Sequence, residues 1–179
     1  MENEVLTLLR ALHTDLLPVT DKLGFKSIHP RRCDDPEGRN CILYPLYRVI
    51  RKVCIHTLDV QYDRCTGYFC VNMGIHFRFL PLTSTDELPN LRKIETSHCV
   101  FRTRLSPKPF GDHWWPVCSS DAETRAQVKD CAATLEGSGM HYFMEYGVLP
   151  GPYGDITVVQ RAHGFLVPPD VGGCPDREG

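Results

Sequence analysis

The clearest pattern of apolar and polar positions covers residues 68–80. Every second side chain in this stretch is apolar, and those between are mostly polar or small; the apolar set is Phe69, Val71, Met73, Ile75, Phe77 and Phe79. A period of two is typical of a β-strand that buries one face. Residues 49–62 form a second extended run, and residues 63–67 between the two have turn chemistry. The pattern predicts a hairpin of two long antiparallel strands.

Residues 2–22 follow a helical period instead. Their apolar side chains recur at steps of three and four; they are Val5, Leu8, Leu9, Leu12, Leu16 and Val19, continued by Leu23. This spacing predicts an amphipathic helix with one apolar stripe. Gly24 suits its C-terminal cap. Pro18 lacks the N–H that would bond the carbonyl of Thr14, so we expect a kink or two abutting helices there.

A second helix is predicted late in the chain. Ser120 and Glu123 form a capping-box pattern, in which the serine oxygen satisfies an early helix N–H. The helix should run to about residue 135 and be broken by the Gly-Ser-Gly of residues 137–139. Residues 140–146 then predict another helical turn or two.

Shorter strands complete the prediction. Residues 24–28 and 156–160 have strand character, and residues 41–47 form an edge strand or an irregular segment because Pro45 interrupts them. Residues 95–105 should form a strand with Cys99 and Phe101 toward the core. We therefore predict an α+β fold, in which an antiparallel sheet of about four to six strands carries an N-terminal and a late amphipathic helix on one face. The domain should span residues 1–165, followed by a flexible tail over residues 166–179.

Composition limits the class of protein. A chain of 179 residues with 42% hydrophobic residues is long and apolar enough for one packed core. The net charge of −2 argues against a dedicated nucleic-acid-binding protein. No apolar run approaches the roughly 18 residues of a membrane span. The acidic N-terminus does not resemble a secretory signal, so we expect a cytoplasmic protein.

The nine cysteines have irregular spacings and include no CxxC pair. In a reducing cytosol we expect free, mostly buried thiols. A disulfide or metal site remains the alternative, with Cys33 and Cys41, or Cys65 and Cys70, as candidate pairs. Neither spacing matches a common zinc site, and no cofactor motif is present, so we expect no metal and no cofactor.

Several segments together resemble a known family. These are residues 21–26 (DKLGFK), 68–75 (YFCVNMGI), 98–105 (HCVFRTRL), 112–115 (DHWW) and the late helix. In this order they resemble a family of bacterial domains of unknown function, over roughly residues 6–146. The resemblance implies helices packed on an antiparallel sheet and brings no established activity. Small bacterial domains of this type often look like members of toxin-neutralising or interaction systems. The segment around Pro45 and the tail after Tyr146 depart from the family.

The candidate binding residues lie on the polar side of the predicted strands and in the aromatic block; they are Arg78, His98, Arg102, Arg104, Asp112, Trp114 and Trp115. In the predicted alignment Asn72 and His76 share the face of the four cationic positions. Such a face could bind a phosphate, a carboxylate or an acidic partner surface. The alternative is a solvated face whose arginines pair with carboxylates of nearby loops.

The two tryptophans are adjacent, so in an extended segment they point opposite ways. One should pack on the core and the other be partly exposed, where Trp114 beside Asp112 and His113 would make an interface hot spot. Alternatively, both indoles wedge a loop onto the sheet.

Catalysis would require a base or nucleophile with partners. His76, His98 and Asp112 are candidate bases, and Cys70 or Cys99 are conceivable nucleophiles, but no catalytic signature surrounds them. We therefore expect a non-enzymatic cytosolic domain that binds another protein, such as an immunity protein that neutralises a bacterial toxin. The alternative is an enzyme or ligand-binding protein that grips a phosphorylated or other anionic substrate with the arginine face.

Overall fold

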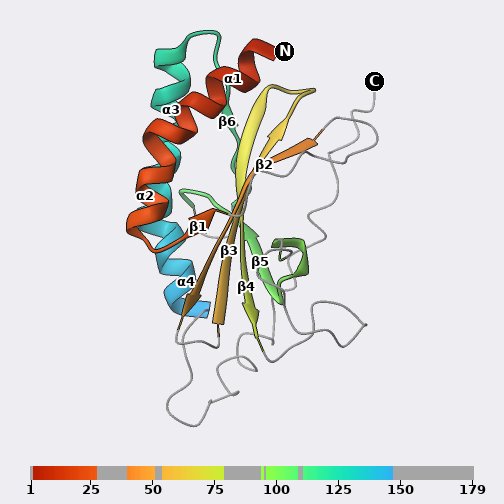
Figure 1. The fold of residues 1–179 in the computed structure, drawn as a ribbon, viewed down its shortest axis with the longest axis vertical. Helices are drawn as coiled ribbons and strands as arrows, with labels where there is room; N and C mark the ends of the chain where they lie inside the picture. The colour runs from red at the N-terminus through yellow and green to blue at the C-terminus, as the bar shows by residue number, and fades with distance from the viewer. Residues whose placement is uncertain are drawn as a thin grey trace.

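The computed structural model describes residues 2–27, 40–50, 54–78, 94, 96–108 and 111–146. In it, two helical columns lie against one face of an antiparallel sheet, so the molecule has two layers (Figure 1). The predicted α+β fold, with an N-terminal and a late helix on one face of the sheet, is confirmed.

The sheet has six strands in the described part of the chain; they are β1 (Lys26–Ser27), β2 (Asn40–Ile50), β3 (Cys54–Asp63), β4 (Tyr68–Phe77), β5 (Phe101–Arg104) and β6 (Trp115–Pro116). Their order is β1-β2-β3-β4-β5, and β6 pairs with the start of β4. Every pairing is antiparallel. Strands β1 to β5 are therefore neighbours in sequence order, as short connections favour, whereas β6 returns to β4 and not to β5.

The β3–β4 hairpin confirms the alternating pattern. Its turn is built by Asp63, whose carboxylate accepts hydrogen bonds from the Cys65 N–H at 2.8 Å and the Thr66 hydroxyl at 2.7 Å. Gly67 closes the turn with φ of 73°, a conformation that favours glycine. The prediction of one extended run over residues 49–62 is wrong, because Ile50 ends β2 and pairs with Cys54 at the start of β3. The reversal was missed since residues 51–53 contain none of the usual turn residues.

Strand β2 is longer and more regular than predicted. It runs through Pro45, and a bulge between Ile42 and Tyr44 lies just before that proline. The short strand β1 pairs only with Leu46 and Tyr47. Within the described residues, Pro45 thus lies on an unpaired stretch of edge, where the missing N–H is tolerated.

The N-terminal column is one continuous helix with a widened turn. α1 (Glu2–Ala11) passes through a π-helical segment, η1 (Leu12–Leu16), into α2 (Leu17–Lys22). The Leu17 N–H donates to the carbonyl of Leu12, a π-type bond immediately before Pro18. The proline is therefore accommodated by a π-turn between two helices, as its missing N–H suggested. Gly24, with φ of 81°, caps the column: its N–H bonds the carbonyl of Asp21 at 2.9 Å.

The late column has the same construction. α3 (Asp121–Thr134) begins at the predicted capping box, where Ser120 Oγ accepts from the Glu123 N–H at 3.2 Å. The predicted break at residues 137–139 is wrong: η3 (Leu135–Gly139) is a π-helical segment that continues into α4 (Met140–Tyr146). Tertiary contacts override the low helix propensity of the two glycines, because Gly139 packs closely against Leu105 of the sheet layer.

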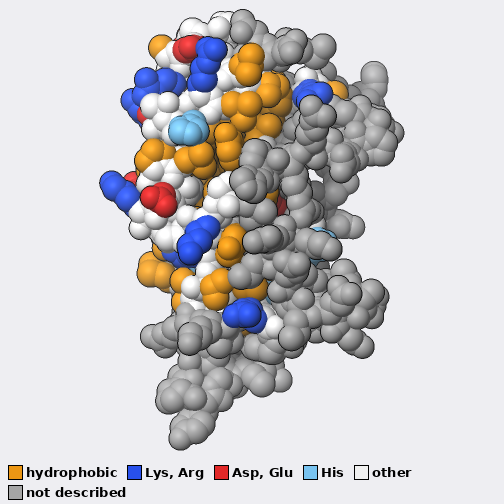
Figure 2. Space-filling view, viewed as in Figure 1, with side chains coloured by type: hydrophobic (Ala, Val, Ile, Leu, Met, Phe, Trp, Pro, Cys, Tyr) orange, Lys and Arg blue, Asp and Glu red, His pale blue; other side chains and the backbone are white. Residues whose placement is uncertain are grey.

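The core lies between the helices and the sheet. Side chains from both columns meet the inward residues of β3 and β4; the largest fully buried ones include Leu8, Leu12, Leu16, Leu58, Met73, Ile75, Phe77, Trp115 and Phe143. In Figure 2 charged side chains lie on the outer, helical side, while apolar side chains gather between the helices and the sheet. The apolar stripes predicted from the sequence thus face the sheet.

Arg48 of β2 also joins α4 to the sheet. The Arg48 guanidinium donates to His56 Nδ1 at 3.1 Å and to the carbonyl of Leu23 at 2.8 Å, and it lies over the rings of Phe25 and Phe143. Burial lowers the pKa of Arg48 from its usual value. Because His56 Nδ1 accepts this hydrogen bond from the guanidinium, that ring nitrogen carries no proton of its own in this arrangement.

The opposite face of the sheet is buried as well, which the sequence did not indicate. A short 3-10 helix, η2 (Thr96–His98), covers its middle: the Thr96 N–H donates to Asp59 at 2.7 Å, and Cys99 lies 3.3 Å from the Thr57 hydroxyl. Residues 95–105 are therefore not one strand. Cys99 is buried, as predicted, but on the face away from the helices.

Some predictions fall outside the described residues, namely the strand at 156–160, Phe79 and the tail at 166–179. The described cysteines whose side chains are placed are free thiols, as expected; they are Cys54, Cys65, Cys70, Cys99, Cys118 and Cys131. No helix in the described ranges combines the length and apolar character that crossing a membrane requires.

Candidate functional site

The face of the sheet away from the helices carries part of the predicted cationic face. Arg104 lies directly opposite Asn72 across the β4–β5 pair, and Arg102 lies opposite Gly74. Directly paired residues point to the same face, and alternation along β4 adds His76 to it. The register thus places Asn72, His76, Arg102 and Arg104 together, as predicted.

Two predicted members of this face lie elsewhere. Arg78 follows the last residue of β4 in an exposed turn. His98 belongs to η2 and not to a strand. Its backbone is curled because Thr96 and Cys99 form a tight turn, with the Cys99 N–H bonded to the carbonyl of Thr96 at 3.1 Å. The four cationic positions therefore do not form one continuous row.

Arg104 is the most constrained residue of the predicted site. Its guanidinium donates to Asn72 Oδ1 at 3.3 Å and forms an ion pair with Asp112. Asn72 is fixed in turn by Gln61, whose side-chain oxygen accepts from Nδ2 at 2.9 Å. The Arg104 side chain is only 9% exposed, whereas that of Asp112 is 65% exposed. Arg104 thus pairs with a carboxylate of a nearby loop, which was one of the two alternatives that the sequence left open for this face.

Trp114 stacks on the same arginine. The guanidinium carbon lies 4.4 Å from the centroid of the indole ring, within the range of a cation–π contact. One side of the indole is held by a cation that is itself bound by Asn72 and Asp112, so the ring is fixed in place. Trp114 is nevertheless partly exposed.

Trp115 points the opposite way, as expected for adjacent residues in an extended segment. It is fully buried, its ring stacks on Phe69 at 5.6 Å, and its indole N–H donates to Asp130 of α3 at 2.8 Å. The prediction that one tryptophan enters the core while the other is partly exposed is confirmed. Trp115 has a structural role, because it joins β6 to the helical layer.

Two further residues complete the surface around Trp114. Tyr68, 42% exposed, begins β4 and lies directly opposite Pro116. Both point away from the helices, since their neighbours Phe69 and Trp115 point toward them. We call the set Tyr68, Asp112, Trp114 and Pro116 the Trp114 surface. Sequence reasoning missed Tyr68, although its place on the polar side of the alternating strand was a usable signal.

The conceivable cysteine nucleophiles are not activated. Burial raises the pKa of the Cys70 thiol to about 12 and that of the Cys99 thiol to about 12. For Cys99 the next contribution, a hydrogen bond with Thr57, acts in the opposite direction. A thiolate is the reactive form of cysteine, so these buried thiols lack the property that a nucleophile requires.

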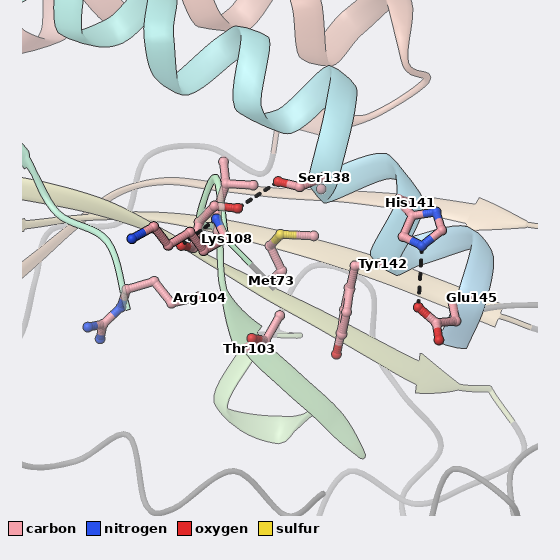
Figure 3. Close-up of a pocket in the computed structure, with 11 residues that line it drawn as sticks. Met73, Thr103, Arg104, Lys108, Ser138, His141, Tyr142 and Glu145 are labelled. Carbon is pink, nitrogen blue, oxygen red and sulfur yellow. Dashed lines mark hydrogen bonds and ion pairs between the residues drawn. The ribbon is translucent and has the colours of Figure 1, made fainter. Parts of the chain in front are cut away.

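A small pocket opens on the other side of β5. It lies between β5 with the loop that follows it and the late helical column, and Met73 lines it from β4 (Figure 3). Its polar rim includes Lys108, His141 and Glu145. These residues come from separate segments without a shared pattern, so the pocket could not be predicted from the sequence. Among the described residues, no three His, Cys, Asp or Glu side chains are grouped so that they could hold a metal ion.

The fold and the surface define a class: a small α+β domain in which the antiparallel sheet, six-stranded over the described residues, carries two π-turn helices on one face and a fixed, partly exposed tryptophan on the other. Residues 42–145 match the family model of a domain of unknown function (DUF4304), and the chain belongs to that family. The match covers β2 to α4, which contain both the Trp114 surface and the pocket. Searches of curated proteins and of solved structures found no match.

Proposed function

We propose that this protein is a non-enzymatic, cytoplasmic protein-binding domain that engages its partner through the Trp114 surface. The observation that carries the proposal is the stacking of the partly exposed Trp114 on Arg104, whose side chain is almost buried and is held by Asn72 and Asp112. A tryptophan fixed before binding loses little conformational entropy on association, and tryptophan is among the residues that dominate binding energy at interfaces. The exposed carboxylate of Asp112 and the ring of Tyr68 add polar and aromatic contacts beside it.

A toxin-neutralising immunity protein is the form of this function that we favour. Such a role needs shape and charge complementarity and no catalytic group. The chain resembles a family of small bacterial domains of unknown function, and domains of this type often look like members of toxin-neutralising systems, an analogy that supports this form.

The alternative is binding of a phosphorylated or other anionic substrate by the arginine face. Arg104 already pairs with Asp112, and Arg102 donates to the carbonyl of Ser97 at 3.4 Å. An anion at Arg104 would have to displace a carboxylate held at short range. This cost makes the anion-binding function the weaker of the two candidates.

The test is affinity capture with the tagged full chain from its native cells, at moderate and high salt, followed by mass spectrometry. Trp114→Ala should remove a stoichiometric partner, because truncation of a hot-spot tryptophan costs about 2 kcal/mol or more, roughly a 30-fold loss of affinity. The matched control is Leu6→Ala, which removes a 46% exposed apolar side chain from α1, in the helical layer. Thermal melts should show both variants folded.

The proposal fails if no protein is captured stoichiometrically, or if Trp114→Ala and Leu6→Ala retain the partner equally. Turnover of a phosphorylated substrate that depends on Arg102 would favour the alternative.

A further inference from the structure

The pocket beside β5 is built by a distortion of the late helix. Ser138 and Gly139, both in the π-helical segment η3, form part of its wall. Ser138 Oγ donates to the carbonyl of Ser106 at 2.6 Å, which ties the π-turn to the loop after β5 (Figure 3). Gly139 admits Leu105, because a Cβ there would lie 2.9 Å from the leucine methyl. π-turns are rare and occur frequently at functional sites. The π-turn of η3 lies in the wall of this pocket, which indicates that the pocket is a candidate site.

The size of the pocket limits what it can hold. Its volume is about 80 Å³. Pockets for small-molecule ligands usually measure about 300–1,000 Å³, so this one is too small to enclose a metabolite. At about 10–15 Å³ for each water-sized group, it accepts a side chain such as leucine or methionine. Met73 and Leu105 provide apolar walls for such a side chain.

The charged side chains at the rim differ in whether an oppositely charged group lies beside them. His141 and Glu145 lie 3.6 Å apart on α4, and Arg104 is paired with Asp112. Lys108 is exposed, and in the described part of the chain no carboxylate lies within ion-pair distance of it. The rim therefore presents the exposed positive charge of Lys108 on the β5 side of the pocket, while the Glu145 carboxylate lies beside His141 on the α4 side (Figure 3).

We infer that this pocket receives an apolar side chain of a partner protein, of the size of leucine or methionine, and that Lys108 pairs with an acidic residue next to that side chain. The inference rests on the proposed protein-binding function and names the chemistry of the partner segment. The pocket and the Trp114 surface flank the same strand, since Arg104 lines the pocket and also holds Trp114. One partner could thus contact both.

The test uses blocked dipeptides as probes on the ¹⁵N-labelled full chain. Acetyl-Leu-Asp-amide and acetyl-Asp-Leu-amide are titrated beside acetyl-Leu-Asn-amide, and amide shifts are followed by NMR. We expect shifts centred on Ser138, Gly139 and Lys108. At least one acidic peptide should bind about two- to fivefold more tightly than the neutral peptide, as expected for an exposed ion pair.

Two variants separate the apolar pocket from the charge. Lys108→Met should remove the preference for the acidic peptide and leave the neutral peptide bound. Thr103→Phe should fill the pocket and abolish binding of all three peptides. Met144→Ala, which alters a 60% exposed residue of α4 that does not line the pocket, should change neither result. Circular dichroism melts verify that each variant is folded.

The inference is overturned if no peptide shifts these amides, if acidic and neutral peptides bind equally to the unmodified chain, or if Lys108→Met keeps the preference. Concentration-dependent shifts of the same amides without peptide would overturn it in favour of a second copy of this chain. Because the readout does not involve Trp114, loss of capture in Trp114→Ala with no peptide binding would reject the pocket and keep the protein-binding function.

Discussion

Replacing Gly74 with alanine tests the burial of the sheet on the side away from the helices. Gly74 lies in the middle of β4, directly opposite Thr57. A Cβ added to Gly74 would lie 2.5 Å from Cys99 Sγ and 2.5 Å from Thr57 Oγ1. Both side chains are buried and 3.3 Å from each other, so neither has an open direction in which to move.

The expected cost follows from these contacts. Overpacking of a filled core typically costs about 1–3 kcal/mol. Displacing Thr57 would also weaken its hydrogen bond to Thr96, which measures 3.1 Å and contributes about 1 kcal/mol. Replacing glycine restricts the unfolded chain and returns about 0.4–1 kcal/mol. We therefore expect Gly74→Ala to lower the free energy of unfolding by about 1–3 kcal/mol.

The assay is urea unfolding of the full chain followed by tryptophan fluorescence, which reports both the buried Trp115 and the partly exposed Trp114. The midpoint should fall while the slope with denaturant stays unchanged, since the surface exposed on unfolding is the same. Gly137→Ala is the control: it lies in a helical segment, and nothing is within 4 Å of its added Cβ. That variant should be neutral or more stable by up to about 1 kcal/mol.

A double variant locates the cause. Gly74→Ala combined with Cys99→Ala should cost less than the sum of the two single changes, because the new methyl group occupies space left by the thiol. An unchanged or raised midpoint for Gly74→Ala, or strict additivity with Cys99→Ala, would refute the packing of Cys99 on this face.

Two further predictions concern a contact between the two helical columns and a contact between the sheet and α3. The Arg125 guanidinium donates to both carboxylate oxygens of Asp15, at 2.7 and 3.0 Å, and holds the pKa of Asp15 below its usual value. A carboxylate whose pKa is lowered in the folded state stabilises the fold at any pH above its unfolded-state pKa. This contribution is lost as the pH falls through the folded-state pKa. Asp15→Asn should therefore lower stability at pH 7, and the difference from the unmodified chain, measured by urea unfolding, should shrink below about pH 4. Trp115→Phe removes the N–H that donates to Asp130 at 2.8 Å and should lower the free energy of unfolding by about 1–3 kcal/mol, and a loss no larger than that of Trp114→Phe would contradict the structural role of Trp115.

The sequence predicted those elements whose signals are local. The period of two in residues 68–77, the apolar stripe of residues 2–22 and the capping box at Ser120 each depend on side chains a few positions apart. Binary patterning of this kind sets which face is buried without reference to the rest of the chain. These elements were therefore predicted correctly in type and orientation.

The errors arose where distant contacts decide the backbone. Residues 137–139 remain helical because Gly139 packs on Leu105 and Ser138 bonds Ser106. Neither partner can be inferred from the propensity of a Gly-Ser-Gly sequence. The strand predicted at His98 was wrong for the same reason. His98 lies in η2, which is held by the hydrogen bond from the Thr96 N–H to Asp59, a residue far away in the sequence. The same limit applies to the site. The strand register that places Arg104 opposite Asn72 was predictable, but the contacts of Asp112 and Trp114 with Arg104 were not.

The distribution of buried polar groups indicates where in the described part of the chain a partner can be recognised. The helical face of the sheet is filled by the core, and the middle of the opposite face is engaged by η2 through Thr57 and Asp59. The end where β4 meets β6 differs, because Tyr68 and Asp112 are exposed there and Trp114 is partly exposed. These three side chains are held by strand pairing, an ion pair and a stacked guanidinium, contacts that maintain a fixed arrangement without covering it. A surface that is both ordered and accessible is what recognition of another protein requires, and for that reason we propose Trp114 as the primary contact of the protein-binding function.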